Sequence, residues 1–223
     1  MSGQDWHILF FTVKVSLLST VLILPVGTGL AWWMSRYKGP GKSVLETLIA
    51  LPIVMPPVAT GLILLKLLGR RGILGHFFYQ FAQFEIVFTW RAVVIAMAVM
   101  SFPFLVRSAQ TAFESVNPRL EQMARTLGVG PLKVFFTITL PLASHGIIAG
   151  SVLAFARALG EFGATILVAG NIPQKTSTLS LSIYQFIQLG KDSDALRLMA
   201  VSILLSFTAV WISQWFLKKS KSL

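Results

Sequence analysis

The chain has 223 residues, of which 55% are hydrophobic and only 12% are charged, and it contains no cysteine. This composition is typical of polytopic membrane proteins, and the lack of cysteine excludes disulfides and thiolate metal sites. The net charge of +11 would also suit a nucleic-acid-binding protein. However, the basic residues gather in short loops between apolar segments, as membrane topology requires, so we expect no nucleic-acid partner.

Five apolar stretches are long enough to cross a hydrocarbon core of about 30 Å, and only helices satisfy the backbone there. They predict an all-α membrane bundle of five transmembrane helices that forms one transmembrane domain over residues 1–223. The expected spans are 7–34, 44–68, 91–113, 143–169 and 196–217.

Two further stretches are short or polar. Residues 73–88 predict an amphipathic segment at the outer interface with Trp90 as its aromatic anchor, and a sixth span is the alternative. Residues 176–190 predict a short helix in an outer loop. Its expected apolar face contains Leu179, Ile183, Phe186 and Ile187.

The second span contains the irregular segment Leu51-Pro52-Ile53-Val54-Met55-Pro56-Pro57. Proline removes a backbone donor, and the carbonyls that it frees must face protein or a water-filled cavity. Pro56 and Pro57 are therefore candidates for a pore-lining or gating element, with a packing kink as the alternative. Pro25 and Pro103 predict ordinary kinks in the first and third spans.

The loops on one side of the predicted bundle are richer in Lys and Arg than those on the other. The richer side holds Arg36, Lys38, Lys42, Arg107, Arg119, Arg125, Lys133, Lys218, Lys219 and Lys221, and the poorer side holds Arg70, Arg71, Arg91, Lys175, Lys191 and Arg197. Basic loops remain in the cytoplasm. The amino terminus is therefore expected outside and the carboxyl terminus inside, which agrees with an odd number of spans.

Residues 118–141 form the longest polar interval on the predicted cytoplasmic side. Pro118 suits a helix start, and Gly128 suits a left-handed helix end. The helix expected between them, over 119–127, has one apolar face of Leu120, Met123, Ala124 and Leu127. A second helix, Leu132 to Thr139, is expected to reach the next span at Leu140-Pro141. Such an apolar knob suits a groove on a partner protein, and a merely interfacial helix is the alternative.

Ionisable residues inside a span are rare and are usually paired or functional. Arg157 and Glu161 lie four residues apart in the fourth span, on one expected helix face. They either pair with each other or across a dimer, or the segment Gly160-Glu161-Phe162-Gly163 belongs to an outer gate. Lys14 in the first span has no evident partner and is expected to snorkel or to face a neighbouring subunit.

The sequence shows no catalytic constellation. His7, His76 and His145 have no metal-ligand spacing, and no Gly-rich phosphate loop with a Lys is present. We therefore expect neither an enzyme nor a cofactor bound by this chain. No internal repeat is visible, which disfavours a secondary transporter. Because five spans are few for enclosing a pathway, a homodimer is expected.

The 118–141 loop resembles the cytoplasmic loop of bacterial ABC importer permeases. In that loop Glu-Ala-Ala is followed by Gly, four residues after the last Ala, and then by Ile-x-Leu-Pro. The positions that match here are Ala124, Gly128, Ile138, Leu140 and Pro141. Gln122 and Met123 stand where Glu and the first Ala usually do, and Glu121 comes one place early. The spacing is kept, although the acidic residue does not stand at its usual position.

Four further segments resemble the molybdate permease subunits of the sulfate and molybdate permease family. They are Ala50 to Val58, Met100-Ser101-Phe102-Pro103, Phe135 to Pro141 and Phe155 to Thr165. Sulfate permeases are similar in the last segment, but they are longer and usually work as two different subunits. The alternatives are therefore a sulfate or other anion permease and, from another class, an ion-coupled carrier that works without an ATPase.

The resemblance implies the fold of a type I ABC importer permease in the bacterial inner membrane. It implies a homodimer that imports molybdate, with tungstate as a second cargo, and an extracytoplasmic molybdate-binding protein. ATP and Mg would be used by a separate cytoplasmic ATPase dimer. The residues expected to couple to it are Glu121, Gln122, Met123, Ala124, Leu127, Gly128, Leu140 and Pro141, and the gate candidates are Pro56, Pro57, Arg157, Glu161, Phe162 and Gly163.

Overall fold

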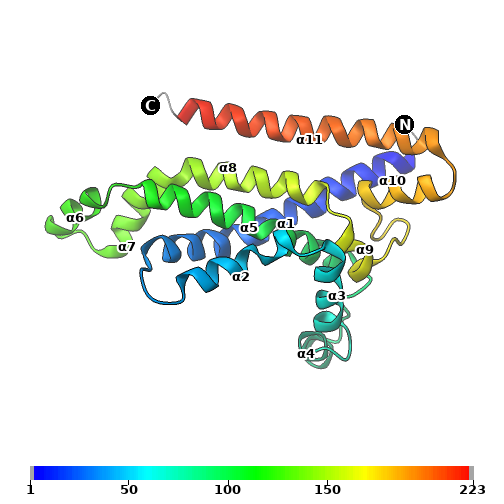
Figure 1. The fold of residues 1–223 in the computed structure, drawn as a ribbon, viewed down its shortest axis with the longest axis horizontal. Helices are drawn as coiled ribbons and strands as arrows, with labels where there is room; N and C mark the ends of the chain where they lie inside the picture. Colours follow the sequence, from blue (N-terminus) through cyan, green and yellow to red (C-terminus); the bar gives the residue numbers. More distant parts are fainter. Residues whose placement is uncertain (1–2, 221–223) are drawn as a thin grey trace.

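The computed structural model describes residues 3–220, and every regular element in that range is a helix. The long helices α1 (Gly3–Arg36), α5 (Trp90–Ser115), α8 (Leu140–Leu159) and α11 (Asp192–Ser220) run along the length of the molecule (Figure 1). One end carries α6 (Pro118–Thr126) and α7 (Pro131–Val134). The other carries α3 (Pro57–Leu68), α4 (Ile73–Ala82), α9 (Gly163–Ala169) and α10 (Leu179–Gln188). We call these the α6 end and the α10 end. The expected all-α bundle is confirmed.

Four helices are long and apolar enough to cross a membrane: α1, α5, the continuous helix Pro131–Leu159, and α11 over Asp192–Ile212. α2 (Lys42–Val54) and α3 would make a fifth crossing if they count as one broken span. The axes of the two helices differ by 109° at the break. The break falls at Met55 and Pro56, inside the irregular segment predicted from the prolines. Pro25 and Pro103, in contrast, lie inside helices that continue through them.

The expected fourth span, 143–169, is wrong at both ends. The helix begins at Pro131 and passes through a π-helical turn, η1 (Phe135–Thr139), into α8, so the expected second loop helix is the start of the span itself. The wider turn closes just before Pro141, with the Leu140 N–H donating to the Phe135 carbonyl. At the other end, Gly160 to Phe162 interrupt the span and separate α8 from α9.

The two short stretches form helices, as expected. α4 has 10 residues and rises about 15 Å, so the alternative of a sixth span is wrong. In α10, Leu179 is buried, and Ile183 and Phe186 pack against Ile8 and Leu198. Ile187 is exposed, so the bundle covers the expected apolar face only in part.

Small residues bring the central helices close together. A Cβ on Gly146 of α8 would lie 2.3 Å from the Ala112 Cβ of α5, and one on Gly150 would lie 2.8 Å from the Ser108 Cβ. The Ser108 hydroxyl donates to the Gly146 carbonyl over 2.8 Å. Close approach through small residues and interhelical hydrogen bonds is how helices associate in lipid, and it makes α5 and α8 the rigid centre of the bundle.

Candidate functional site

The two interrupted spans meet each other near the α10 end. A Cβ added to Gly163, the first residue of α9, would lie 2.8 Å from the Pro57 Cβ, and one on Gly61 would lie 2.8 Å from the Ala164 Cα. Only glycine permits this approach of α3 and α9. The structure thus brings together Pro57 and Gly163, which the sequence proposed separately as gate candidates. Pro56 caps α3 directly beside them.

Glu161 clamps the break between α8 and α9. It is 1% exposed, its Oε2 lies 2.7 Å from Arg157 Nη2, and its Oε1 accepts the Ala164 N–H over 2.9 Å. The placement of both residues on one helix face is wrong, because α8 ends at Leu159 and Glu161 lies in the break. The expected pairing within one chain is confirmed. A buried carboxylate with a charged partner and a backbone donor is well satisfied.

Phe162 follows in the same break. Its ring lies 4.9 Å from that of Tyr184 in α10, centroid to centroid. Of the six gate candidates, Pro56, Pro57, Glu161, Phe162 and Gly163 therefore surround one contact between two helix breaks, and Arg157 reaches it from the last turn of α8. Helix breaks concentrate unpaired backbone groups and freedom of motion at one level of a bundle, so this contact is the candidate gate.

The second candidate site is α6, whose two ends are built by its own sequence. The Asn117 side chain accepts the Arg119 N–H, and Pro118 occupies the first turn. At the other end Gly128 is left-handed, with φ 81°. The N–H groups of Gly128 and Val129 return to the carbonyls of Arg125 and Ala124. The predicted start and stop signals are confirmed.

The two sides of α6 differ in exposure. Leu120, Met123 and Leu127 are 44%, 64% and 82% exposed and form an apolar outer face. Ala124 is buried on the side that faces the bundle, together with Glu121, so its predicted place in the exposed knob is wrong. Gln122 and Gly128 are exposed, and farther along, Leu140 is half-buried and Pro141 is exposed at the start of α8.

Glu121 connects α6 to two other elements. Its Oε1 accepts from the Arg36 guanidinium at the end of α1 and from the Thr139 hydroxyl in η1, the latter over 2.7 Å. The carboxylate that comes one place early in the sequence motif therefore points inward rather than outward. Arg36 and Thr139 are 85 and 18 positions away, so no local pattern identified them as its partners.

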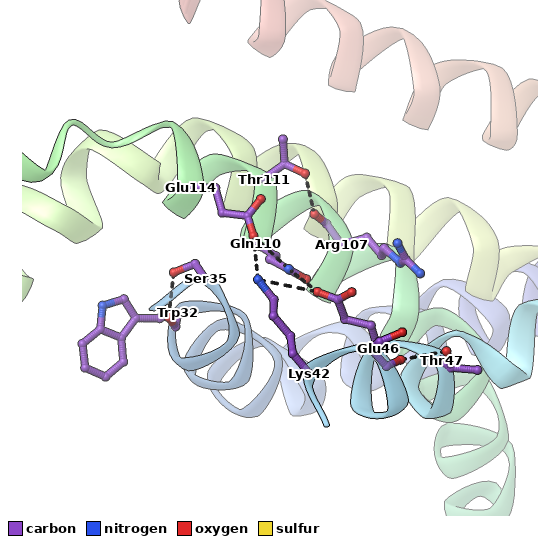
Figure 2. Close-up of polar contacts among 10 residues, drawn as sticks. Trp32, Ser35, Lys42, Glu46, Thr47, Arg107, Gln110, Thr111 and Glu114 are labelled. Atoms are coloured by element: carbon purple, nitrogen blue, oxygen red, sulfur yellow. Dashed lines mark hydrogen bonds and ion pairs between the residues drawn. The ribbon is translucent and has the colours of Figure 1, made fainter. Parts of the chain in front are cut away.

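A second polar cluster attaches α2 to α5 (Figure 2). Gln110 Nε2 donates to Glu46 Oε1 and Glu114 Oε1 over 2.9 and 3.0 Å. Lys42 Nζ lies 3.8 and 3.5 Å from the same two carboxylates. The α2 helix has no buried residue, so this cluster is a principal attachment of the first half of the broken span. From the sequence, Lys42 was predicted only as a topology signal, and no local pattern predicted the cluster.

The two sets of basic residues lie toward opposite ends of the bundle, as expected. Arg36 ends α1, and Arg119 and Arg125 lie in α6 at the α6 end, whereas Arg70 and Lys191 lie between helices at the α10 end (Figure 1). Lys221 lies outside the described residues. The charge asymmetry is therefore a property of the folded chain as well as of its sequence.

Residues 23–221 match the family described as "Binding-protein-dependent transport system inner membrane component". The chain belongs to this family. It is therefore a multi-pass permease component of the inner membrane and not an enzyme, and it belongs to a system that also has ATPase and binding-protein components.

Several relatives are similar to this permease over most of their length. The molybdenum transport system permease protein ModB of Escherichia coli (strain K12) is 46% identical over 99% of this chain and 97% of its own. ModB of Haemophilus influenzae is 41% identical over 93% and 91%. The sulfate transport system permease protein CysT of Salmonella typhimurium is 37% identical over 88% and 72%.

Solved structures show the same fold at low sequence identity. The MetNI methionine ABC transporter in an inward-facing conformation has a TM-score of 0.74 and 13% identity, covering 99% of both chains. A bacterial alginate ABC transporter in complex with its periplasmic protein has a TM-score of 0.72 and 18% identity, covering 96% of this permease and 78% of that chain. The fold is that of an ABC importer permease.

Proposed function

We propose that two copies of this permease form the membrane pathway of an ATP-driven importer for molybdate, with tungstate as a second cargo. The observation that carries the cargo assignment is the 46% identity to a molybdenum permease over 99% of the chain. The sulfate permease is less similar, at 37%, and longer, since the match covers 72% of it. Sulfate or another anion is therefore the second candidate cargo.

A second copy accounts for the exposed surface around the α2–α3 break. Ile53, Val54, Val58 and Leu62 are all exposed apolar residues there. Contiguous apolar surface of this kind marks an interaction site or a lipid-facing surface. In a homodimer, each copy would contribute one candidate gate contact, α3 against α9, beside a shared pathway.

The α6 end would face the cytoplasm, which places the amino terminus outside and the carboxyl terminus inside. There the face of Leu120, Met123 and Leu127 would enter a groove on each ATPase subunit, in the manner of a helix that docks through its apolar side. ATP and Mg would be bound by that partner and not by this chain. The α10 end would receive the extracytoplasmic binding protein.

The contacts of Glu121 suggest how movement of the ATPase reaches the membrane. A displacement of α6 would be passed through Glu121 to Arg36 on α1 and to Thr139 at the start of the fourth span. The helices would then move as rigid bodies and alternately open the pathway to either side. The contact of α3 with α9 is the proposed gate. Arg157 and Glu161 neutralise each other beside it, so the pair offers no net charge to a dianion.

ATP hydrolysis by the permease and its cognate ATPase in lipid vesicles tests this proposal. The binding protein is added empty, loaded with molybdate, or loaded with sulfate. We expect stimulation by the molybdate-loaded form above the other two. Stimulation by the sulfate-loaded form alone would make this a sulfate permease, and failure to associate with any ATPase would favour an ion-coupled carrier.

A further inference from the structure

A pocket of about 470 Å³ lies between the first half of α1, the start of α5 and the loop that joins α9 to α10. Three basic side chains line it: Lys14, Arg91 and Lys175. Among the side chains that the structure describes, no carboxylate forms an ion pair with any of them. The pocket takes part in neither the gate contact nor the attachment of α6.

The positive charge of this pocket has no counterion within the described chain. Arg91 is positioned by the rings of Phe84 and Trp90, 4.5 and 5.4 Å from their centroids, rather than by an acid. All three cations are exposed, and cations that line one recess repel one another and attract an anion. The missing component is therefore a negatively charged group.

The depth of Lys14 places the pocket at a membrane boundary. Residues 15–35 contain no Asp, Glu, Lys or Arg, and about 20 helical residues cover the hydrocarbon thickness of about 30 Å. Lys14 and Arg36 therefore mark the two boundaries of the apolar core along α1. Trp90, which lines the same pocket, is the residue type that concentrates at this level. Lipid phosphate groups lie at that depth.

The stretch of α1 that runs from the pocket toward the α6 end exposes an apolar surface. Leu18, Leu22 and Val26 follow Lys14 in steps of four residues along α1, and all three are exposed. A cation above an exposed apolar stripe matches a lipid, whose headgroup is charged and whose chain is not. A route for a free oxyanion would instead need polar groups along this stretch of α1. We propose that this pocket binds the phosphate group of an anionic phospholipid, with an acyl chain along α1.

The backbone around the pocket supports a built site. Phe88 and Gln174, with φ of 59° and 62°, are left-handed non-glycine residues, and both line the pocket. Such conformations are uncommon for residues with a Cβ, and they cluster at ligand sites. They set the rim of the recess from two separate loops.

Native mass spectrometry of the intact permease–ATPase complex, titrated with phosphatidylglycerol or phosphatidylcholine, tests the proposal. We expect tighter binding of phosphatidylglycerol, weakened about fivefold by each of Lys14→Gln, Arg91→Gln and Lys175→Gln, since one basic residue near an anionic surface contributes about 1 kcal/mol. The control is Arg71→Gln, which removes a charge from the turn between α3 and α4, outside the pocket. We expect it to leave binding unchanged.

Three results would overturn the proposal. Equal affinity for the two lipids would show that charge does not select the ligand. Displacement of the lipid by millimolar phosphate or molybdate, with the same dependence on the three cations, would make the pocket a site for free oxyanions. Dissociation of two copies of the permease in the Lys14→Gln variant would show that a second chain covers the pocket.

Discussion

The α6 region and the α3–α9 contact are held together in opposite ways. α6 has its own capping residues and an exposed apolar face. The polar contacts of Glu121 attach it to the bundle. In the α3–α9 contact, Gly61 and Gly163 bring the two helices so close that an added Cβ would clash, and the buried carboxylate of Glu161 clamps the neighbouring break between α8 and α9. The first region tolerates changes on its outer face, whereas the second tolerates no added atom.

Under the proposed function, this contrast corresponds to a division between transmission by α6 and gating by the α3–α9 contact. A contact that must follow a moving partner benefits from a few directional bonds around an otherwise exposed helix. A contact that must close a pathway benefits from tight apolar packing, since packed interfaces switch between discrete arrangements instead of deforming gradually. Substitutions in the two regions should therefore fail in different assays.

The largest effect is expected from charging the outer face of α6 with Met123→Glu and Leu127→Glu together. Both side chains are mostly exposed, so the permease should fold normally, whereas burying two carboxylates in an apolar groove would prevent docking. Co-purification of the ATPase and molybdate uptake should both be lost. Thr126→Glu, at an exposed position on another side of α6, is the matched control and should retain both. Retention of the ATPase by the double variant would contradict the docking role.

The next effect is expected from Gly163→Val, with Gly160→Val as its control. A Cβ at Gly163 meets Pro57, whereas at Gly160 nothing lies within 4 Å. Overpacking costs about 1–3 kcal/mol, and separation of α3 from α9 should reduce uptake about tenfold or more while ATPase association persists. Uptake in vesicles and thermal unfolding are measured for both variants. Equal uptake by the two would show that the α3–α9 contact does not gate.

Glu161→Gln should have a smaller effect. The amide oxygen can still accept the Ala164 N–H, but Arg157 loses its ionic partner. Breaking a buried ion pair costs up to about 3–5 kcal/mol, and less where one partner stays partly hydrated, as Arg157 is at 26% side-chain exposure. We expect a several-fold loss of uptake and a lower melting temperature. Unchanged coupled uptake would remove Glu161 from the gate.

The smallest effect is expected from Glu121→Gln. The permease should still bind the ATPase, because the outer face of α6 is untouched, but the tie to Arg36 weakens by about 1–3 kcal/mol. The ratio of molybdate imported to ATP hydrolysed should then fall about threefold. Arg36→Gln should lower this ratio similarly, and the double variant should add little. A proportional loss of both activities would indicate that Glu121 only stabilises the fold.

Local chemistry in the sequence determined the all-α class, the membrane-spanning character of the long helices, the bounds of α6 and the existence of α4 and α10. These features depend on apolar run length, on capping residues such as Asn117 and Gly128, and on prolines such as Pro56. Each acts within a few residues of its own position, so it can be read without knowing the fold. The charge asymmetry between the two ends is determined in the same way.

Only the tertiary structure decided which distant residues meet. Glu121 contacts Arg36, Glu46 contacts Gln110, and Pro57 packs on Gly163 because separate helices cross there. Those crossings depend on the packing of whole faces, which a single sequence does not display. The interruption of the fourth span at Gly160 to Phe162 was hidden for a related reason. An apolar stretch can continue through a break when a buried side chain such as Glu161 satisfies the groups that the break exposes.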